Sequence, residues 1–581
     1  MAVTESTVEA PPAAPAELGP ADRDGFISSA QAELTAIERF IGTVDHKQLG
    51  RRYTVTALVV TAVGFIVRAL GWAGANGGDA LLGDWSLQVR ESADIAVVVL
   101  GVLALIVGIA VYVVPLQIGA RGISFPRLVA LSYYSWLVST VLFAASMLGD
   151  GGIGGNSLEM GRLGVFALIA GAVSILGGMI AVMTTVLTLR APGMSLARTP
   201  MFAFSMLVSG ALWLATVPAI VAVGVLMQAN RSNAGAIKMD SVDNLRFLGW
   251  QPTVWILAIP VIGLAVDIVP VATGSRLMQR FAFRGLLVIL GVASFGVWAV
   301  DPALSFNTFV WIAFSGLALL AVLASLGGLL PELRRLDGAP SAPGALIGSL
   351  AALALLTLAG ILGGLAAVNT IGSGEDGLLG LPAINGLISA QSNVILGASV
   401  VGLLTALAFW GVKFTGTLPA MGAAAGLALL AGLGAVIAGA GGVVDAIASI
   451  DGGTGSGELA AWLIAAGSIV LALSLLGAAG VLIVGLRAGE TGPADPFDGH
   501  TLEWLTASPP STMNFDDELP EVTSASPLLD ARRRQRTSKG ATDEFHSRRA
   551  GATCPAQASP DGDRRGACGR FIRHVGGHPV G

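Results

Sequence analysis

Long apolar runs separated by short polar connections make up most of residues 46–487. Apolar residues are continuous within each run rather than alternating, which favours helices over β-strands. About 20 apolar residues in a helix cross the hydrocarbon core of a bilayer, where unpaired backbone groups are not tolerated. The pattern therefore predicts an all-α integral membrane protein with about twelve transmembrane helices. We place them at residues 53–72, 94–118, 128–148, 162–189, 202–228, 253–274, 283–301, 306–330, 343–367, 384–411, 418–445 and 458–486.

Polar segments flank this membrane domain on both sides. Residues 1–45 are rich in Ala, Pro, Glu and Asp, and they contain no apolar run. Residues 488–581 are polar and rich in Pro, Gly and Arg. Such compositions bury too little apolar surface to fold alone, so we expect a disordered arm and a largely disordered tail. The sequence thus predicts one membrane domain, residues 46–487, between two polar extensions.

Composition supports the membrane assignment and excludes other classes. The chain is 54% hydrophobic and 12% charged, with a mean hydropathy of +0.75. An ordinary soluble domain carries about 25% charged residues. The net charge of −5 belongs mainly to the polar extensions, and no basic stripe indicates nucleic acid as a partner. The expected partner of the apolar surface is the lipid bilayer.

Positive charge predicts the orientation of the helices. Lys and Arg crowd alternate connections, whereas the connections near 370–383 and 446–457 contain none. The basic connections hold Lys47, Arg51, Arg52, Arg121, Arg127, Arg190, Arg198, Arg276, Arg280, Arg284, Arg334, Arg335, Lys413 and Arg487. Cytoplasmic loops carry the excess of positive charge, so both termini are expected in the cytoplasm. The 229–252 connection, with Arg231, Lys238 and Arg246, fits this rule least well.

Six short motifs occur in an order that matches a known family. They are VDHKQLGRRY at 44–53, VPLQIGARGISFPR at 114–127, SILGGMIAVMTTVLTLRAPGM at 174–194, the apolar segment 247–270, WGVKFTG at 410–416, and TLEWLTASPPSTMNFDDELP at 501–520. With the predicted spans, they resemble subunit I of the haem-copper terminal oxidases, the cytochrome c oxidase family. The resemblance implies a twelve-helix bundle in a bacterial-type plasma membrane, beside the respiratory chain. It also implies association with other oxidase subunits or with a second copy.

Members of that family hold two haems and a copper ion through six histidines, but this chain has no histidine between His46 and His500. Other residues stand at the matching positions, and the family's copper-site tyrosine is also replaced. The six positions hold Ala93, Gln251, Val300, Asp301, Ala390 and Ser392, and the tyrosine position holds Trp255. A one-residue shift in the tenth span would place Gln391 and Asn393 at the last two positions. These side chains are poor haem or copper ligands, so we expect no haem, no copper and no other metal.

The family's proton pathways are also missing from the matching positions. Gly122 and Val129 stand where the family has a channel-mouth aspartate and its asparagine partner, and Thr253 replaces a glutamate. There is no lysine between Lys238 and Lys413 and no basic residue in 439–457. Loss of ligands, proton carriers and propionate partners together predicts a member without catalysis, and we therefore expect no catalytic residue.

Two charged residues remain at family-like positions within the spans. Arg68 lies near the end of the first span, where the family has an arginine that contacts the low-spin haem. Without a haem ligand, we expect this side chain to snorkel to the outer interface. Asp267 matches an acidic position late in the sixth span, and an intramembrane carboxylate is a candidate functional site. A structural hydrogen bond near the cytoplasmic end is the alternative for Asp267.

Three functions remain open on this reading. The first is a structural or assembly role in the respiratory chain without catalysis. The second is a small-solute or proton pathway through the vacated cofactor cavities. The third is an active oxidase subunit, transferring electrons from cytochrome c to oxygen with proton translocation, through unrecognised ligands. A haem spectrum separates the third from the others, and solute flux in liposomes separates the second from the first.

Overall fold

The computed structural model describes most of the membrane domain and part of the tail. The described ranges are 42–74, 82–83, 85–232, 239–296, 305–369, 381–450, 456–489, 491–515, 518–519 and 521–535. Within them, the side chains of residues 231–251, 305–308, 381–382 and 456 lie outside the description. Contacts divide the chain into two units, residues 1–528 and 529–581, and the first unit contains all the helices from α3 to α15. The predicted arm, apart from its last residues, lies outside the described ranges.

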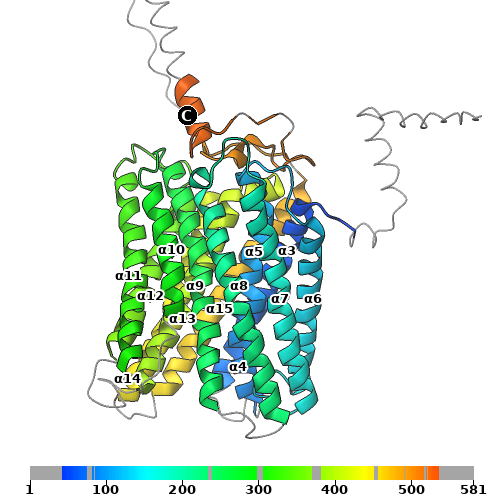
Figure 1. Cartoon of the computed structure of the whole chain (residues 1–581), viewed down its shortest axis with the longest axis vertical. Helices are drawn as coiled ribbons and strands as arrows, with labels where there is room; N and C mark the ends of the chain where they lie inside the picture. Colours follow the sequence, from blue (N-terminus) through cyan, green and yellow to red (C-terminus); the bar gives the residue numbers. More distant parts are fainter. Residues whose placement is uncertain are drawn as a thin grey trace, which may run out of the picture. The chain divides into compact units, whose positions relative to one another are not determined.

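The described residues form helices and no β-strand, as expected for continuous apolar runs (Figure 1). Helix α3 begins at His46, and α4, a π-helical turn and α5 together form one rod, Trp85–Gln117. The helices are α3 His46–Gly74, α4 Trp85–Ala96, the π-helical Val97–Val102, α5 Leu103–Gln117, α6 Pro126–Leu148, α7 Leu158–Thr188, α8 Met201–Ser232, α9 Met239–Ala272, α10 Arg280–Gly296, α11 Ser305–Leu333, α12 Pro343–Val368, α13 Leu381–Thr415, α14 Met421–Ile450 and α15 Ser456–Ala488. Two 3-10 turns, Leu196–Arg198 and Leu502–Leu505, follow α7 and α15 in the connections.

Every predicted span coincides with a helix. Within the described ranges, eleven helices are long and apolar enough to cross a membrane. The remaining predicted span, 283–301, overlaps α10. Helix α10 has 17 residues, and residues 297–304 lie outside the described ranges. At 1.5 Å per residue, 17 residues span about 26 Å, slightly less than the hydrocarbon core. The prediction of an all-α membrane bundle is confirmed.

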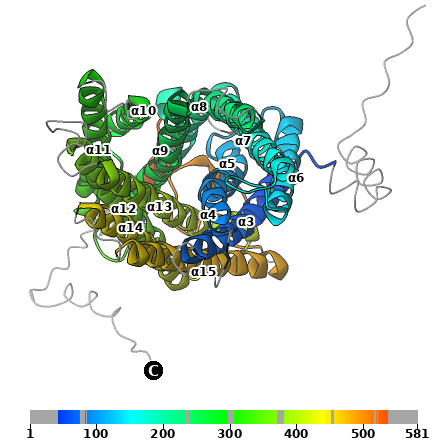
Figure 2. The same cartoon turned by 90° about the horizontal axis from the view of Figure 1, so that it is seen from below.

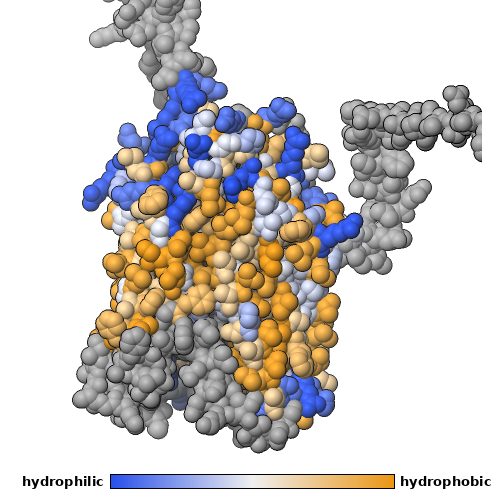
Figure 3. Space-filling model, viewed as in Figure 1, coloured by the Kyte–Doolittle hydropathy of each residue, from blue (hydrophilic) through white to orange (hydrophobic). Residues whose placement is uncertain are grey.

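The helices divide into an enclosed group and a lipid-facing group. The most apolar windows of Trp85–Gln117 and Ala383–Thr415 are 100% buried, whereas those of Pro126–Leu148 and Phe309–Leu333 are 33% buried. The end-on view accordingly shows α4, α5, α9 and α13 surrounded by the remaining helices (Figure 2). Outward-facing apolar side chains such as Leu131 and Leu320 form a belt, and hydrophilic residues gather at the end that carries the tail (Figure 3).

Small residues let the enclosed helices approach closely. A Cβ atom on Gly442 of α14 would lie 2.4 Å from the backbone nitrogen of Ala390 in α13. A Cβ on Gly467 of α15 would lie 2.5 Å from the backbone nitrogen of Ala438 in α14. Both distances are shorter than real Cβ contacts, so only glycine fits at either position. Such contacts are typical of membrane bundles, in which packing rather than hydrophobicity holds helices together.

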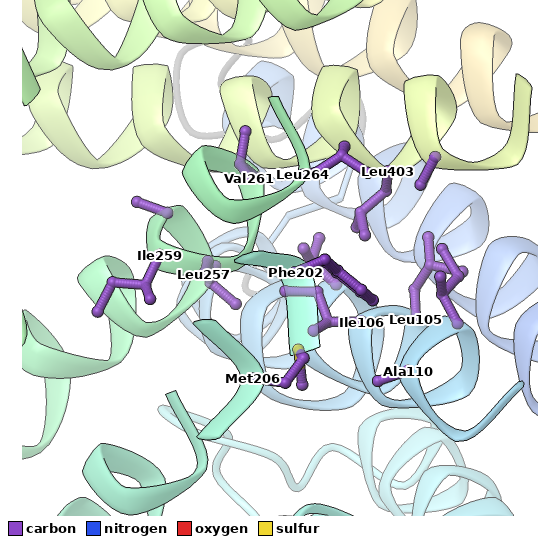
Figure 4. Packing of buried hydrophobic residues seen from close by; sticks show 14 of the residues in the cluster. Leu105, Ile106, Ala110, Phe202, Met206, Leu257, Ile259, Val261, Leu264 and Leu403 are labelled. Atoms are coloured by element: carbon purple, nitrogen blue, oxygen red, sulfur yellow. The ribbon is translucent and has the colours of Figure 1, made fainter. Parts of the chain in front are cut away.

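Aliphatic side chains fill the space between α5, α8, α9 and α13. Leu105 and Ile106 of α5 lie near Phe202 and Met206 of α8 and near Leu257 of α9 (Figure 4). All of these side chains are buried, in one continuous cluster. Close packing of this kind leaves few spaces larger than a water molecule.

Part of the tail packs on the end of the bundle where α3 begins. Val522 donates its backbone N–H to the carbonyl of Pro192, and Asn514 contacts His46 and Lys47 at the start of α3. We call residues 491–528 the cap and this end of the bundle the cap face. The prediction that the tail is largely disordered is therefore wrong for the cap, whose Trp504 and Phe497 are buried like core residues. Residues 536–581 lie outside the described ranges.

Candidate functional site

Ala93, at the family's low-spin haem position in the second span, is buried in α4 and 2% exposed. The π-helical turn Val97–Val102 follows it, and Leu103 donates its N–H to the carbonyl of Val98. Such turns are often found at functional sites. The turn lies against α3, where the Cβ of a residue at Gly64 would lie 2.8 Å from Val97. The π-helical turn thus begins four residues after Ala93, whose side chain is a methyl group.

Arg68 is the centre of a polar cluster one helix away from Ala93. Its Nε lies 2.5 Å from Oδ1 of Asp94, the residue after Ala93. Its Nη1 donates to Oγ of Ser468 at 2.8 Å, and its Nη2 donates to Oδ1 of Asn393 at 2.6 Å. The Arg68 side chain is 5% exposed and the Asp94 side chain 30%. One guanidinium thus joins α3, α4, α13 and α15.

The prediction that Arg68 snorkels to the outer interface is wrong. Its side chain points to neighbouring helices, where Asp94 supplies a countercharge and Ser468 and Asn393 each accept one further hydrogen bond. Trp72 also donates its indole N–H to Asp94 at 3.1 Å, and Asn393 donates to the carbonyl of Ala438 at 3.4 Å. The Arg68 cluster is therefore electrically neutral, and each of its buried charges has a partner.

The contacts of α13 bear on the two readings of the tenth span. Asn393 faces Arg68, whereas Ser392 is half-buried and lies outside the Arg68 cluster. Ala390 lies against Gly442 of α14, and the Gln391 side chain lies against Gly363 of α12. The shifted position Asn393, rather than Ser392, is therefore the one adjacent to the retained arginine. Neither its amide nor the side chain of Ala390 offers a haem ligand.

Trp255, at the family's tyrosine position in the sixth span, is 1% exposed. Its indole N–H has no hydrogen-bond partner. Thr253, at the position of the family's glutamate, is also buried. The Gln251 side chain and residues Val300 and Asp301 lie outside the described ranges, so their predicted positions stay predictions. No described residue at the predicted ligand positions fits a haem or a copper ion.

Asp267 links three helices at the cap face. Its carboxylate accepts the backbone N–H groups of Met201 at 2.9 Å and Phe202 at 2.8 Å, which are the first residues of α8. The Gln117 side chain at the end of α5 donates to the same carboxylate at 3.4 Å. A carboxylate at a helix N-terminus satisfies unpaired N–H groups and opposes the positive end of the helix dipole. This geometry fits the structural alternative for Asp267.

A second buried carboxyl group, Glu503, was missed by the sequence analysis. Glu503 lies in the short turn Leu502–Leu505 of the cap and is 1% exposed. Its Oε1 accepts from Oγ1 of Thr501 at 2.7 Å and from Nε1 of Trp410 at 3.3 Å, whereas its buried Oε2 has no partner. Burial raises the pKa of Glu503 to about 7. The hydrogen bond from the Thr501 hydroxyl stabilises the anion and lowers the pKa in part. Because the tail was expected to be largely disordered, Glu503 was not considered as a site residue.

Lys413, in the last turn of α13, is a buried cation that contacts the cap. Its Nζ donates to the cap carbonyls of Ala494 at 2.8 Å and Thr506 at 2.6 Å, and its charge lies over the Trp504 ring. Lys47 makes a similar contact, with Nζ donating to Oδ1 of Asn514 at 2.8 Å. Two lysines expected to mark a cytoplasmic surface therefore hold the cap in place.

The described residues contain no group of three His, Cys, Asp or Glu side chains that could hold a metal ion. A groove of about 560 Å³ lies on the outer side of α7 and α8, lined by apolar residues such as Leu176 and Pro218. None of the predicted ligand positions lines it. It is open to the surroundings of the bundle.

Comparison with known proteins agrees with the sequence motifs. Residues 48–374, more than half of the chain, match the family described as cytochrome c and quinol oxidase polypeptide I. The chain is 28% identical over 310 residues to the heme-copper oxidase subunit I+III of Aeropyrum pernix, covering 47% of this chain and 36% of that protein. It is 28% identical over 312 residues to the probable cytochrome c oxidase subunit 1-alpha of Streptomyces coelicolor, covering 47% and 52%.

A third relative gives the same picture. The cytochrome c oxidase subunit 1 of Corynebacterium efficiens is 28% identical over 330 residues, which cover 49% of this chain and 56% of that protein. The matched part thus spans about half the length of these relatives, or less. The family match, residues 48–374, extends from α3 to α12 and therefore includes Arg68, Ala93 and Asp267.

Proposed function

Because the chain belongs to the cytochrome c and quinol oxidase polypeptide I family, we propose that it is a non-catalytic respiratory-chain membrane protein with a structural or assembly role. The observation that carries this proposal is the Arg68 cluster. A protein carboxylate and two neutral side chains now satisfy the arginine that the resemblance places beside a haem. A bundle whose interior is closed by its own side chains can persist without cofactors.

Absorption spectroscopy tests the absence of catalysis most directly. We expect the purified chain to carry no stoichiometric haem by pyridine haemochrome assay and no copper by metal analysis. One haem per chain would overturn the proposal and favour the active oxidase subunit. A catalytically intact relative, purified in the same way, is the control for haem supply during expression.

The structural role predicts a partner. We propose that the chain associates with another respiratory-oxidase subunit or with a second copy through its lipid-facing helices. In mild detergent it should co-purify with that partner, and its deletion should leave oxidase turnover per assembled enzyme unchanged. Recovery of monomer alone would contradict the role. Solute flux in liposomes containing the chain would then support the pathway, although the aliphatic packing in Figure 4 does not favour one.

We propose that the cap face is cytoplasmic, in a bacterial-type plasma membrane. Support comes from Lys47, Lys413 and the basic connections that precede α6, α8 and α10, since cytoplasmic loops carry such charge. Reporter fusions at Gln88 and Gly452 should then report the outside, and a fusion at Gly338 the inside. An inside signal at Gly452 would contradict the even number of spans.

A further inference from the structure

Buried oxygen atoms without a hydrogen-bond partner occur both in the cap and in the helices beneath it. Glu503 Oε2 and Gln117 Oε1 are both buried and without a partner. Gln117 reaches Asp267 through its other amide atom, and Asp267 interacts electrostatically with Glu503. Trp410, which donates to Glu503, and Phe202, whose backbone N–H donates to Asp267, have ring centres 5.1 Å apart. Unpaired buried acceptors are costly, and two carboxylates with an unpaired amide oxygen lack the hydrogen that would satisfy them.

Among the residues that the structure describes, no ion pair with Glu503 is present. Among the described residues, Lys413 is the cation that interacts with Glu503 from α13, but its Nζ is bonded to cap carbonyls. Asp495 of the cap also interacts with Lys413, and Arg280 at the start of α10 interacts with Asp267. None of these groups forms an ion pair with Glu503. The charged form of Glu503 is therefore poorly stabilised in its buried position.

We propose that Glu503, with Asp267 and Gln117, forms a proton-binding site. The proton bound at this site holds the cap on the bundle. The proton resides on Glu503 Oε2, which turns an unpaired acceptor into a donor. Loss of the proton to bulk water leaves a buried anion beside Asp267. The anion is stabilised by moving into water, so the turn Leu502–Leu505 leaves the bundle and the cap opens.

Burial and geometry set the pH at which this occurs. Burial raises the pKa of Glu503 to about 7, and the negative charge of Asp267 acts in the same direction. Hydrogen bonds from Thr501 and Trp410 oppose the shift. The site is therefore occupied below pH 7 and empty above it. The inference stands independently of the structural role proposed above, since it concerns the cap alone.

Infrared difference spectroscopy on the full chain in lipid nanodiscs tests the bound proton. The carbonyl stretch of a protonated, buried carboxylic acid should be present at pH 6 and lost with a midpoint near pH 7. It should be absent from Glu503→Gln and unchanged in Glu518→Gln, which removes an exposed carboxyl from the same cap. Absence of the band from the wild type, or its persistence in Glu503→Gln, would overturn the proposal.

Hydrogen exchange tests the coupling to the cap. After correction for intrinsic rates, amides of residues 500–515 should lose at least tenfold protection between pH 6 and pH 8 in the wild type. Glu503→Gln should stay protected at both values, since its amide group imitates the protonated acid. Glu503→Met, which removes the titrating group without a polar substitute, should also show no pH dependence.

Two further results would contradict the proposal. Equal protection of the wild-type cap at pH 6 and pH 8 would separate the proton from cap docking. A midpoint that shifts when sodium replaces choline at constant ionic strength would assign the cluster to a metal cation instead of a proton.

Discussion

The two ends of the bundle differ in how a buried ionisable side chain is stabilised. Arg68 lies 22 residues into α3, about 33 Å from its start, and has a carboxylate within 2.5 Å. Glu503, at the cap face, accepts from one hydroxyl and one indole N–H and forms no ion pair with a described residue. The first charge is held by a directly bonded countercharge, whereas burial raises the pKa of Glu503 to about 7, so that a change in pH near neutrality alters its charge. The comparison separates a structural cluster from a responsive one within a single chain.

The largest expected effect comes from unpairing Arg68. Asp94→Asn should lower the free energy of unfolding by about 3 kcal/mol, because it leaves a buried guanidinium without its countercharge. Arg68→Met should cost less, since the remaining Asp94 is 30% exposed and can reach water. The double variant Arg68→Met/Asp94→Leu should cost less than the two single effects added. Unfolding in mixed micelles measures all three, and strict additivity would show that the pair is not coupled.

The next effect concerns pH and belongs to Glu503. Its folded pKa of about 7 exceeds the ordinary value of 4.5, so the folded state binds more protons between these values. The stability contribution is therefore greatest below pH 4.5 and falls as pH rises to 7, by at most about 3 kcal/mol. The unfolding free energy of the wild type, minus that of Glu503→Gln, should therefore fall as the pH rises from 4.5 to 7. A difference independent of pH would remove the contrast between the two ends.

An intermediate effect tests whether packing, rather than charge, holds α13 and α14 together. Gly442→Ala should destabilise the bundle by about 2 kcal/mol, because the added methyl group meets the backbone of Ala390. Gly426→Ala, on the same helix, has nothing within 4 Å of the new Cβ and is the matched control. Thermal unfolding in detergent should show a large loss for the first variant only. Equal behaviour would mean that the close approach is not needed.

The smallest effect refines the Glu503 site. Thr501→Val removes the hydroxyl that donates to Glu503 Oε1 at 2.7 Å, with little change in shape. That hydrogen bond stabilises the anion, so the apparent pKa of Glu503 should rise by about one unit, for a loss of about 1 kcal/mol. The midpoint of the infrared band reports the change. A downward shift would show that the hydroxyl serves the protonated form.

The bundle was predictable from the sequence because a membrane span depends on local composition. Each predicted run, from 53–72 to 458–486, became a helix with boundaries displaced by a few residues or extended into the connections. The partners of Arg68 were not predictable, since Asn393 and Ser468 are 325 and 400 residues away. A charge near the end of an isolated span suggests snorkelling, and only the fold shows that neighbouring helices satisfy it.

The cap was missed for a related reason. Its composition is polar, and polar segments are usually disordered when they have no surface to pack against. Here the surface is the end of the bundle, with Lys47 and Lys413 supplying donors for carbonyls and for Asn514. The segment 501–520 did resemble the family's tail, and that resemblance was the signal that could have identified Glu503.

The sequence spacing within the Arg68 cluster also bears on the order of events during synthesis. Asp94 follows Arg68 by 26 residues, but Ser468 follows it by 400. At about 5–20 residues per second, the ribosome supplies Asp94 roughly 1–5 s after Arg68, and Ser468 only after roughly 20–80 s. A helix carrying an uncompensated arginine would be costly to leave in lipid for that long. The ion pair with Asp94 therefore neutralises the Arg68 charge once α4 has followed α3 into the bilayer, long before α15 exists to complete the bundle.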